Sequence, residues 1–165
     1  MTFEELEIPG VYSAEADRFR DSRGWLVETF RQDNLEEAGL KDALPMMSYI
    51  SLTHPGIARG PHEHINQTDT FAFLGPSTFR VFLWDNRPSS PTCGKRIVLT
   101  LGEESPAILV VPPGVVHAYQ NVGITEGLVL NYPNRLYGGK GKKGPVDEVR
   151  HEDDPGSPFQ LAEIP

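Results

Sequence analysis

The chain has 165 residues, of which 38% are hydrophobic and 23% charged, so length and composition predict one soluble globular domain. Its formal net charge of −8 argues against binding to nucleic-acid phosphates. The single cysteine, Cys93, excludes an intramolecular disulfide, and no apolar run is long enough to cross a membrane. Because the acidic N-terminus does not have the pattern of a signal peptide, we expect a cytoplasmic protein that binds neither nucleic acid nor membrane.

The first predicted element in chain order is one short helix near the N-terminus, over residues 31 to 44. Leu35, Ala38 and Leu40 give it a modest apolar stripe, and Pro45 ends it. Short apolar segments separated by Gly- and Pro-rich turns then predict strands over residues 70–74, 78–85, 96–101, 107–111 and 127–132. Many closely spaced strands without βαβ alternation indicate an all-β sandwich or jelly roll.

From Gly138 onward the sequence is polar and rich in Gly, Pro and Asp. We expect a single domain over residues 1–165 whose tail, from about residue 138, is irregular and wraps the surface or a partner subunit. The tail contains the main basic cluster, GGKGKKG at residues 138–144. Its shortness and its glycines indicate a solvated loop.

The histidines carry the strongest chemical signal. His62 and His64 lie two residues apart, so in a strand both side chains would project from one face. Asp69 follows five residues later, and His117 stands at a strand start after a proline–glycine turn in PPGVVHAYQN. These segments resemble the two cupin motifs. In metal-binding cupins the ligands stand at the positions of His62, His64, Asp69 and His117, and imidazole and carboxylate suit several transition metals.

Three further motifs narrow the resemblance. The first is D-x-R-G-aromatic-x-x-E-x-aromatic, carried here by Asp21, Arg23, Gly24, Trp25, Glu28 and Phe30. The second is R-G-x-H, at Arg59, Gly60 and His62, and the third is D-x-R followed by S-P-T-x-G, at residues 85–94. In this order and spacing they resemble the dTDP-4-dehydrorhamnose 3,5-epimerase family, a branch of the cupin superfamily.

The resemblance implies a cupin-type jelly roll that works as a homodimer, without a metal or an organic cofactor, on a dTDP-4-keto-6-deoxy sugar. His62 would be the general base that removes a proton next to the ketone, and Tyr132 the acid that returns one. Arg23 and Arg59 would hold the diphosphate, and Glu28 would face the thymine. The remaining expected substrate contacts are Gln67, His117 and Tyr137.

The sequence departs from the family at one chemically important position. Family members carry a lysine that stabilises the enolate oxygen, and Asp69 stands in its place. A carboxylate beside a developing enolate would raise the barrier. One explanation is a metal that replaces the lysine. The other, which we prefer, resembles the sugar 3,4-ketoisomerases, in which an H-x-H pair shuttles the proton; here His62 and His64 would do so, with Asp69 setting a histidine tautomer.

Three functions therefore remain open from the sequence. The first is an epimerase or isomerase of a dTDP-4-keto-6-deoxy sugar. The second is a metal-dependent cupin enzyme that uses His62, His64, Asp69 and His117. The third is a non-catalytic protein that binds a nucleotide sugar.

Overall fold

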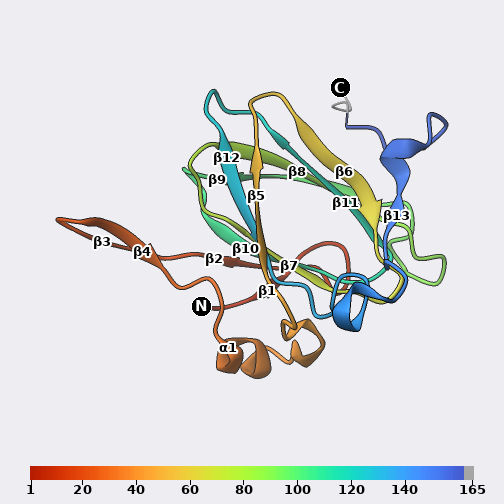
Figure 1. Ribbon diagram of the computed structural model, residues 1–165, viewed down its shortest axis with the longest axis horizontal. Helices are drawn as coiled ribbons and strands as arrows, with labels where there is room; N and C mark the ends of the chain where they lie inside the picture. Colours follow the sequence, from red (N-terminus) through yellow and green to blue (C-terminus); the bar gives the residue numbers. More distant parts are fainter. Residues whose placement is uncertain (162–165) are drawn as a thin grey trace.

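A computed structural model describes residues 1–161 (Figure 1). Two antiparallel sheets contain most of the strand residues, and they confirm the predicted all-β, cupin-type jelly roll. The larger sheet has the order β1-β2-β10-β7-β12-β5, with β1 (Glu4–Glu5), β2 (Tyr12–Glu15), β10 (Ala107–Val111), β7 (Asp69–Phe73), β12 (Gly127–Asn131) and β5 (Tyr49–Thr53). The smaller sheet has the order β13-β6-β11-β8-β9, with β13 (Val149–Arg150), β6 (Ala58–Glu63), β11 (Val115–Asn121), β8 (Thr78–Asp85) and β9 (Arg96–Gly102).

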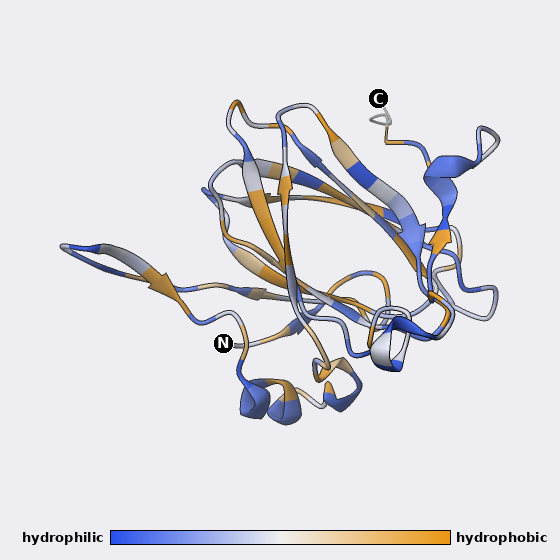
Figure 2. Cartoon of the chain, in the orientation of Figure 1, coloured by the Kyte–Doolittle hydropathy of each residue, from blue (hydrophilic) through white to orange (hydrophobic). Residues whose placement is uncertain are grey.

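The main core lies between these two sheets, because alternate residues of each strand point inward. Phe71 and Phe73 of β7, Leu109 of β10, and Phe79 and Leu83 of β8 are all buried there. Fully burying such a side chain contributes about 1.5–3 kcal/mol relative to leaving it exposed. Hydrophobic residues accordingly follow the strands in Figure 2, whereas helix α1 and the tail are mainly hydrophilic.

The predicted helix is shorter than expected. Helix α1 covers Gln32–Glu37, and a separate 3-10 turn, η1, covers Lys41–Ala43. Gly39 adopts a left-handed φ of 76° directly after the α1 cap, which is the usual way for a helix to end. The apolar stripe continues on both sides of this glycine, so the pattern alone predicts one helix where the structure has two short elements.

A two-stranded hairpin, β3 (Arg18–Asp21) and β4 (Gly24–Val27), forms a third, separate sheet. It projects from the body of the molecule as an arm (Figure 1). Its apolar side chains are largely uncovered, with Phe19 63% and Leu26 64% exposed. This arm has no counterpart among the strands expected from the sequence.

The tail lies against its own chain. It contains two 3-10 turns, η2 (Lys140–Lys142) and η3 (His151–Asp153), and between them β13 pairs with β6 so that Arg150 stands opposite His62. Beyond η3, the Phe159 ring packs against Trp84 of β8 with 5.7 Å between ring centroids. The tail therefore borders the histidine-bearing strand; the last four residues of the expected domain, 162–165, lie outside the described part.

No helix within residues 1–161 is long and apolar enough to cross a membrane.

Candidate active site

Four predicted site residues come together at one end of the barrel. His62 lies on β6 and pairs in register with His117 of β11, which brings their ring centroids to 4.5 Å. His64 follows β6 directly, and its ring centroid lies 5.9 Å from that of His62. Asp69 begins β7 and is only 1% exposed. Strand alternation and antiparallel pairing thus assemble residues that lie up to 55 positions apart in the sequence (117 − 62 = 55).

The hydrogen bonds of two histidines direct their Nε2 atoms at Asp69. The Nδ1 of His64 bonds the carbonyl of Asp147, and the Nδ1 of His117 bonds the carbonyl of Val115 at 3.1 Å. A carbonyl can only accept, so both Nδ1 atoms carry hydrogen. The His64 Nε2 lies 2.9 Å and the His117 Nε2 3.4 Å from the Asp69 Oδ2.

Asp69 Oδ2 and His117 Nε2 are buried and lack a hydrogen-bond partner of acceptable geometry within residues 1–161. The other carboxylate oxygen, Oδ1, accepts hydrogen bonds from Gln67 and Asn131, both at 3.0 Å. Gln67 also reaches the His64 Nε2 at 3.1 Å. Asp69 Oδ2, His64 Nε2 and His117 Nε2 therefore form a cluster of three atoms that can each accept a cation. A proton or a metal ion shared among them would satisfy all three.

The electrostatics of the cluster separate the histidines into two types. Burial lowers the pKa of His62 to about 2, and the neighbouring His117 and His64 add to this effect, so its imidazole is neutral near pH 7. Burial also acts to lower the pKa of His64, but the hydrogen bond and charge of Asp69 outweigh it and raise that pKa. Burial raises the pKa of Asp69, yet contacts with His117 and His64 hold it below its ordinary value.

Two adjoining cavities open on these side chains. The first, of about 390 Å³, is lined by His62 together with Arg59, Tyr49, Ser51 and Tyr119. The second, of about 290 Å³, is lined by residues that include His64, Gln67, Tyr49 and Tyr137. The structure therefore places the predicted residues Arg59, Gln67 and Tyr137 around the same site as the histidines.

Tyr132 is not brought to the histidines. Along β12, Val129 and Asn131 face the barrel interior, so the following Tyr132 points to the opposite side of the sheet. There its hydroxyl bonds Thr29 at 2.6 Å and its ring stacks on Phe30. The interior position next to it belongs to Asn131, which the sequence reading overlooked. The alternation that makes Val129 a core residue could have identified it.

Arg23 and Glu28 also lie away from the histidines of their own chain. Arg23 sits in the turn of the projecting arm, where its guanidinium binds Asp21 and its side chain is 88% exposed. Glu28 follows the arm and lies 3.8 Å from Arg31. Neither residue lines the two cavities described above.

The S-P-T-x-G motif has a structural role. The carboxylate of Asp85, at the end of β8, accepts hydrogen bonds from Arg87, Ser90 and Thr92. Since Asp85 is only 1% exposed, these donors satisfy a charge that would otherwise be costly to bury. The motif therefore fixes a loop and lines neither of the two cavities.

Comparisons with known proteins agree with this architecture. The family model described as dTDP-4-dehydrorhamnose 3,5-epimerase matches residues 5–137. The "Probable low-salt glycan biosynthesis epimerase Agl13" of Haloferax volcanii is 33% identical over 134 residues, which cover 79% of this chain and 83% of that protein. The dTDP-4-dehydrorhamnose 3,5-epimerase of Shigella flexneri is 31% identical over 118 residues, covering 70% of this chain and 65% of that protein.

A solved structure gives the same result for the fold. The dTDP sugar isomerase of Desulfovibrio desulfuricans G20 superimposes with a TM-score of 0.78 at 24% identity, covering 94% of each chain. The match of sequence motifs, strand order and relatives leads to one conclusion: the chain belongs to the dTDP-4-dehydrorhamnose 3,5-epimerase family.

Proposed function

We propose that this protein epimerises or isomerises a dTDP-4-keto-6-deoxy sugar by moving a proton next to the ketone. The observation that carries the proposal is a buried, neutral His62 that lines a cavity and lies beside a carboxylate shared by two other histidines. The names of its relatives support the substrate class, since the Shigella flexneri protein is a dTDP-4-dehydrorhamnose 3,5-epimerase.

His62 is the base. Neither of its ring nitrogens makes a hydrogen bond to a residue in the described part of the chain, so a lone pair is free to accept a proton. The proton leaves the carbon next to the ketone and binds a ring nitrogen of His62. The electrons of the C–H bond form the enolate, and the new imidazolium supplies positive charge beside it.

Asp69 replaces the family lysine, and its charge must be offset for this step to proceed. A proton held between Asp69, His64 and His117 neutralises the carboxylate, which then no longer opposes the enolate. The raised pKa of His64 is what such a shared proton requires. His64, His117 and Gln67 thus act on the reaction through Asp69.

Tyr49 is our candidate for returning the proton, in place of Tyr132. It lines both cavities, and its hydroxyl accepts a 2.8 Å hydrogen bond from Asn131, the residue that also binds Asp69. Burial and the charge of Asp69 raise the pKa of Tyr49, so the phenol keeps its proton until the enolate forms.

A homodimer would explain the projecting arm. We propose that the arm of one copy reaches the cavity of the other and delivers Arg23 and Glu28 to the nucleotide. The exposed Phe19 and Leu26 on the arm, and the exposed Ile50 on edge strand β5, provide apolar surface for such a contact.

The exposed, unpaired Cys93 favours a cytoplasmic location for the protein, because cytoplasmic proteins rarely form disulfides.

A metal-dependent enzyme is the second candidate, because the same cluster fits a divalent transition metal. Nitrogen atoms of His62, His64 and His117 lie within 4.8 Å of one another, and Asp69 Oδ2 offers an unpaired oxygen between two of them. The Nδ1 bonds of His64 and His117 to carbonyls are typical of metal-ligating histidines. A bound ion would supply Lewis acidity toward a carbonyl oxygen.

Deuterium uptake tests the main proposal. Incubated with dTDP-4-keto-6-deoxyglucose in heavy water, the protein should place deuterium on a ring carbon next to the ketone, and His62→Asn should abolish that uptake. His54→Asn is the matched control, since His54 is exposed and pairs with Glu126. Tight binding without any exchange would support the non-catalytic alternative instead.

Elemental analysis of protein purified without a metal-affinity tag separates the two candidates. Full deuterium-exchange activity with far less than one metal ion per chain would rule out the metal-dependent candidate. Activity that is lost on chelation and restored by one divalent ion per chain would replace the metal-free proposal.

A further inference from the structure

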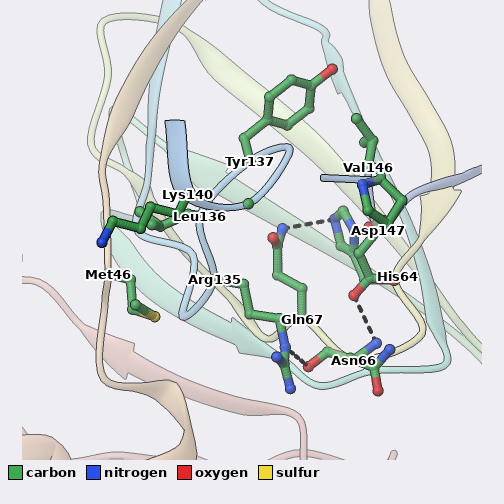
Figure 3. A pocket seen from close by; sticks show the side chains of 12 residues that line it. Met46, His64, Asn66, Gln67, Arg135, Leu136, Tyr137, Lys140, Val146 and Asp147 are labelled. Atoms are coloured by element: carbon green, nitrogen blue, oxygen red, sulfur yellow. Dashed lines mark hydrogen bonds between the residues drawn. The ribbon is translucent and has the colours of Figure 1, made fainter. Parts of the chain in front are cut away.

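We propose that Asp147, in the tail, is a positioning residue of the candidate active site: it fixes the ring of His64 so that Nε2 presents a lone pair to Asp69. Its effect on the reaction rests on the function proposed above. Asp147 lines a third cavity, of about 360 Å³, where it lies beside His64 (Figure 3). The family model ends at residue 137, so Asp147 lies beyond the part of the chain that matches the family.

The carboxylate of Asp147 holds the segment that follows His64. One carboxylate oxygen accepts the backbone N–H of Ile65 at 2.9 Å, and the other accepts that of Asn66 at 2.8 Å. Figure 3 shows the bond to Asn66 as a dashed line. Hydrogen bonds to an ionised acceptor are about twice as strong as neutral ones. The two bonds therefore tie the tail to the segment that connects β6 with β7.

The same residue binds the imidazole of His64 through its main chain. The carbonyl oxygen of Asp147 accepts the hydrogen of His64 Nδ1. Two residues further along the chain, Val149 pairs with Glu63 in the ladder between β13 and β6. The main chain around this carbonyl is thus held by the ladder on one side and by the Asp147 carboxylate on the other. Both attachments keep the carbonyl at the edge of the imidazole ring.

Two contacts favour a hydrogen on Nδ1 of His64, and one favours a hydrogen on Nε2. The Asp147 carbonyl accepts from Nδ1, and the Gln67 amide nitrogen, which can only donate, lies 3.1 Å from Nε2. Asp69 Oδ2, 2.9 Å from Nε2, would instead accept a hydrogen from it. Without the Asp147 carbonyl, the charged acceptor would outweigh the neutral amide donor, because charge-assisted hydrogen bonds are the stronger. Asp147 therefore decides which tautomer the neutral ring adopts.

The tautomer of His64 matters for the proposed reaction. With the hydrogen on Nδ1, the Nε2 lone pair and Asp69 Oδ2 can share a cation, as proposed above. With the hydrogen on Nε2, His64 satisfies Asp69 directly, and the carboxylate keeps its negative charge beside the enolate. That charge would raise the barrier. Asp147 thus acts on the rate through His64 and Asp69, and it lines neither of the two cavities at His62 and Tyr49.

Ring ¹⁵N chemical shifts of the full-length protein test the inference, because they distinguish the two neutral tautomers of histidine. At a pH at which the His64 ring is neutral, the unmodified protein should carry the ring hydrogen on Nδ1, and Asp147→Ala should carry it mainly on Nε2. Asp147→Asn keeps one side-chain oxygen as an acceptor, so its tautomer populations should lie between these two. The amide hydrogens of Ile65 and Asn66 should exchange with solvent about tenfold faster in Asp147→Ala.

Asp154→Ala is the matched control. Asp154 lies in the same tail and accepts the backbone N–H of Gly156, but it lines none of the three cavities. This variant should leave the tautomer of His64 and the rate of deuterium uptake unchanged. Asp147→Ala should lower kcat for deuterium uptake about tenfold and leave KM within about twofold, as expected for a residue that orients another.

Two outcomes would overturn the inference. One is a His64 ring that keeps its hydrogen on Nδ1 in Asp147→Ala, and the other is a changed tautomer with an unchanged kcat. If Asp147→Ala does not fold, the tautomer populations of Asp147→Asn decide the question. The proposed function can fail separately: an unmodified protein that takes up no deuterium, but whose His64 tautomer depends on Asp147, would remove the epimerase and leave Asp147 as the residue that positions His64.

Discussion

His64 and Asp69 meet at 2.9 Å inside the barrel, with their side chains only 8% and 1% exposed. At this distance a carboxylate and an unprotonated imidazole nitrogen would repel each other, so the pair requires a positive charge. The family resemblance predicts a lysine in this region of the site. In our proposal a shared proton, or alternatively a bound ion, would supply that charge.

The first prediction concerns that shared charge. Asp69→Asn removes the anion that raises the pKa of His64, so His64 should become neutral near pH 7. The ¹⁵N chemical shifts of its ring, followed by NMR across pH, would report the change. The exposed His54 serves as the internal reference. A ring of His64 that titrates as before would contradict the shared proton.

The second prediction concerns stability against pH. The pKa of His64 is raised on folding. Its contribution to the free energy of unfolding is therefore fully present below about pH 6.5 and is lost as the pH rises through the pKa of His64 in the folded state. The pKa of His62 is lowered to about 2 on folding, so the unfolded chain binds more protons below about pH 6.5 and stability falls toward acid. The free energy of unfolding in urea should therefore be greatest near pH 6.5.

Variants separate the two limbs of that curve. His64→Gln should flatten the alkaline limb, and His62→Gln should reduce the slope of the acid limb by up to about 1.4 kcal/mol per pH unit. An alkaline limb that persists in His64→Gln would have to come from another group.

The third prediction separates two tyrosines. Tyr49→Phe should lower the exchange or epimerisation rate strongly, by about 100-fold, because the proton donor is lost. Tyr132→Phe should leave the rate within about twofold and cost about 1 kcal/mol of stability, because only the bond to Thr29 is removed. A steady-state assay and a thermal melt of each variant are sufficient. The reverse pattern would show that Tyr132 reaches the substrate after all.

The fourth prediction concerns the arm. Arg23→Ala and His62→Asn should each be nearly inactive, but a mixture of the two should regain part of the activity. In a mixed dimer one cavity combines an intact arm with an intact His62, so up to about a quarter of full activity should return if subunits pair at random and each dimer has two sites. Light scattering would confirm the dimer. A mixture that stays as inactive as its components would mean that the arm does not serve the neighbouring site.

Local patterns in the sequence were sufficient for much of the fold. Strands β8 (Thr78–Asp85) and β10 (Ala107–Val111) have the bounds that their sequences predicted, because both segments are short, rich in β-branched or aromatic residues and bounded by turn residues. The sequence did not predict the arm or strand β5. Their apolar residues Phe19, Leu26 and Ile50 are exposed, so they do not follow the alternation of buried and exposed positions that marks a strand. The proposed contact with a second copy of the chain would cover these side chains.

The sequence by itself determined the family, the jelly roll and the convergence of His62, His64, Asp69 and His117, because side-chain alternation and motif spacing are local properties of strands. Only the tertiary structure decided that Tyr132 faces away, that Asn131 faces inward, and that the tail brings Asp147 to His64. Those facts depend on which face of β12 meets the core and where a polar tail comes to lie. Contacts between residues distant in the sequence set both.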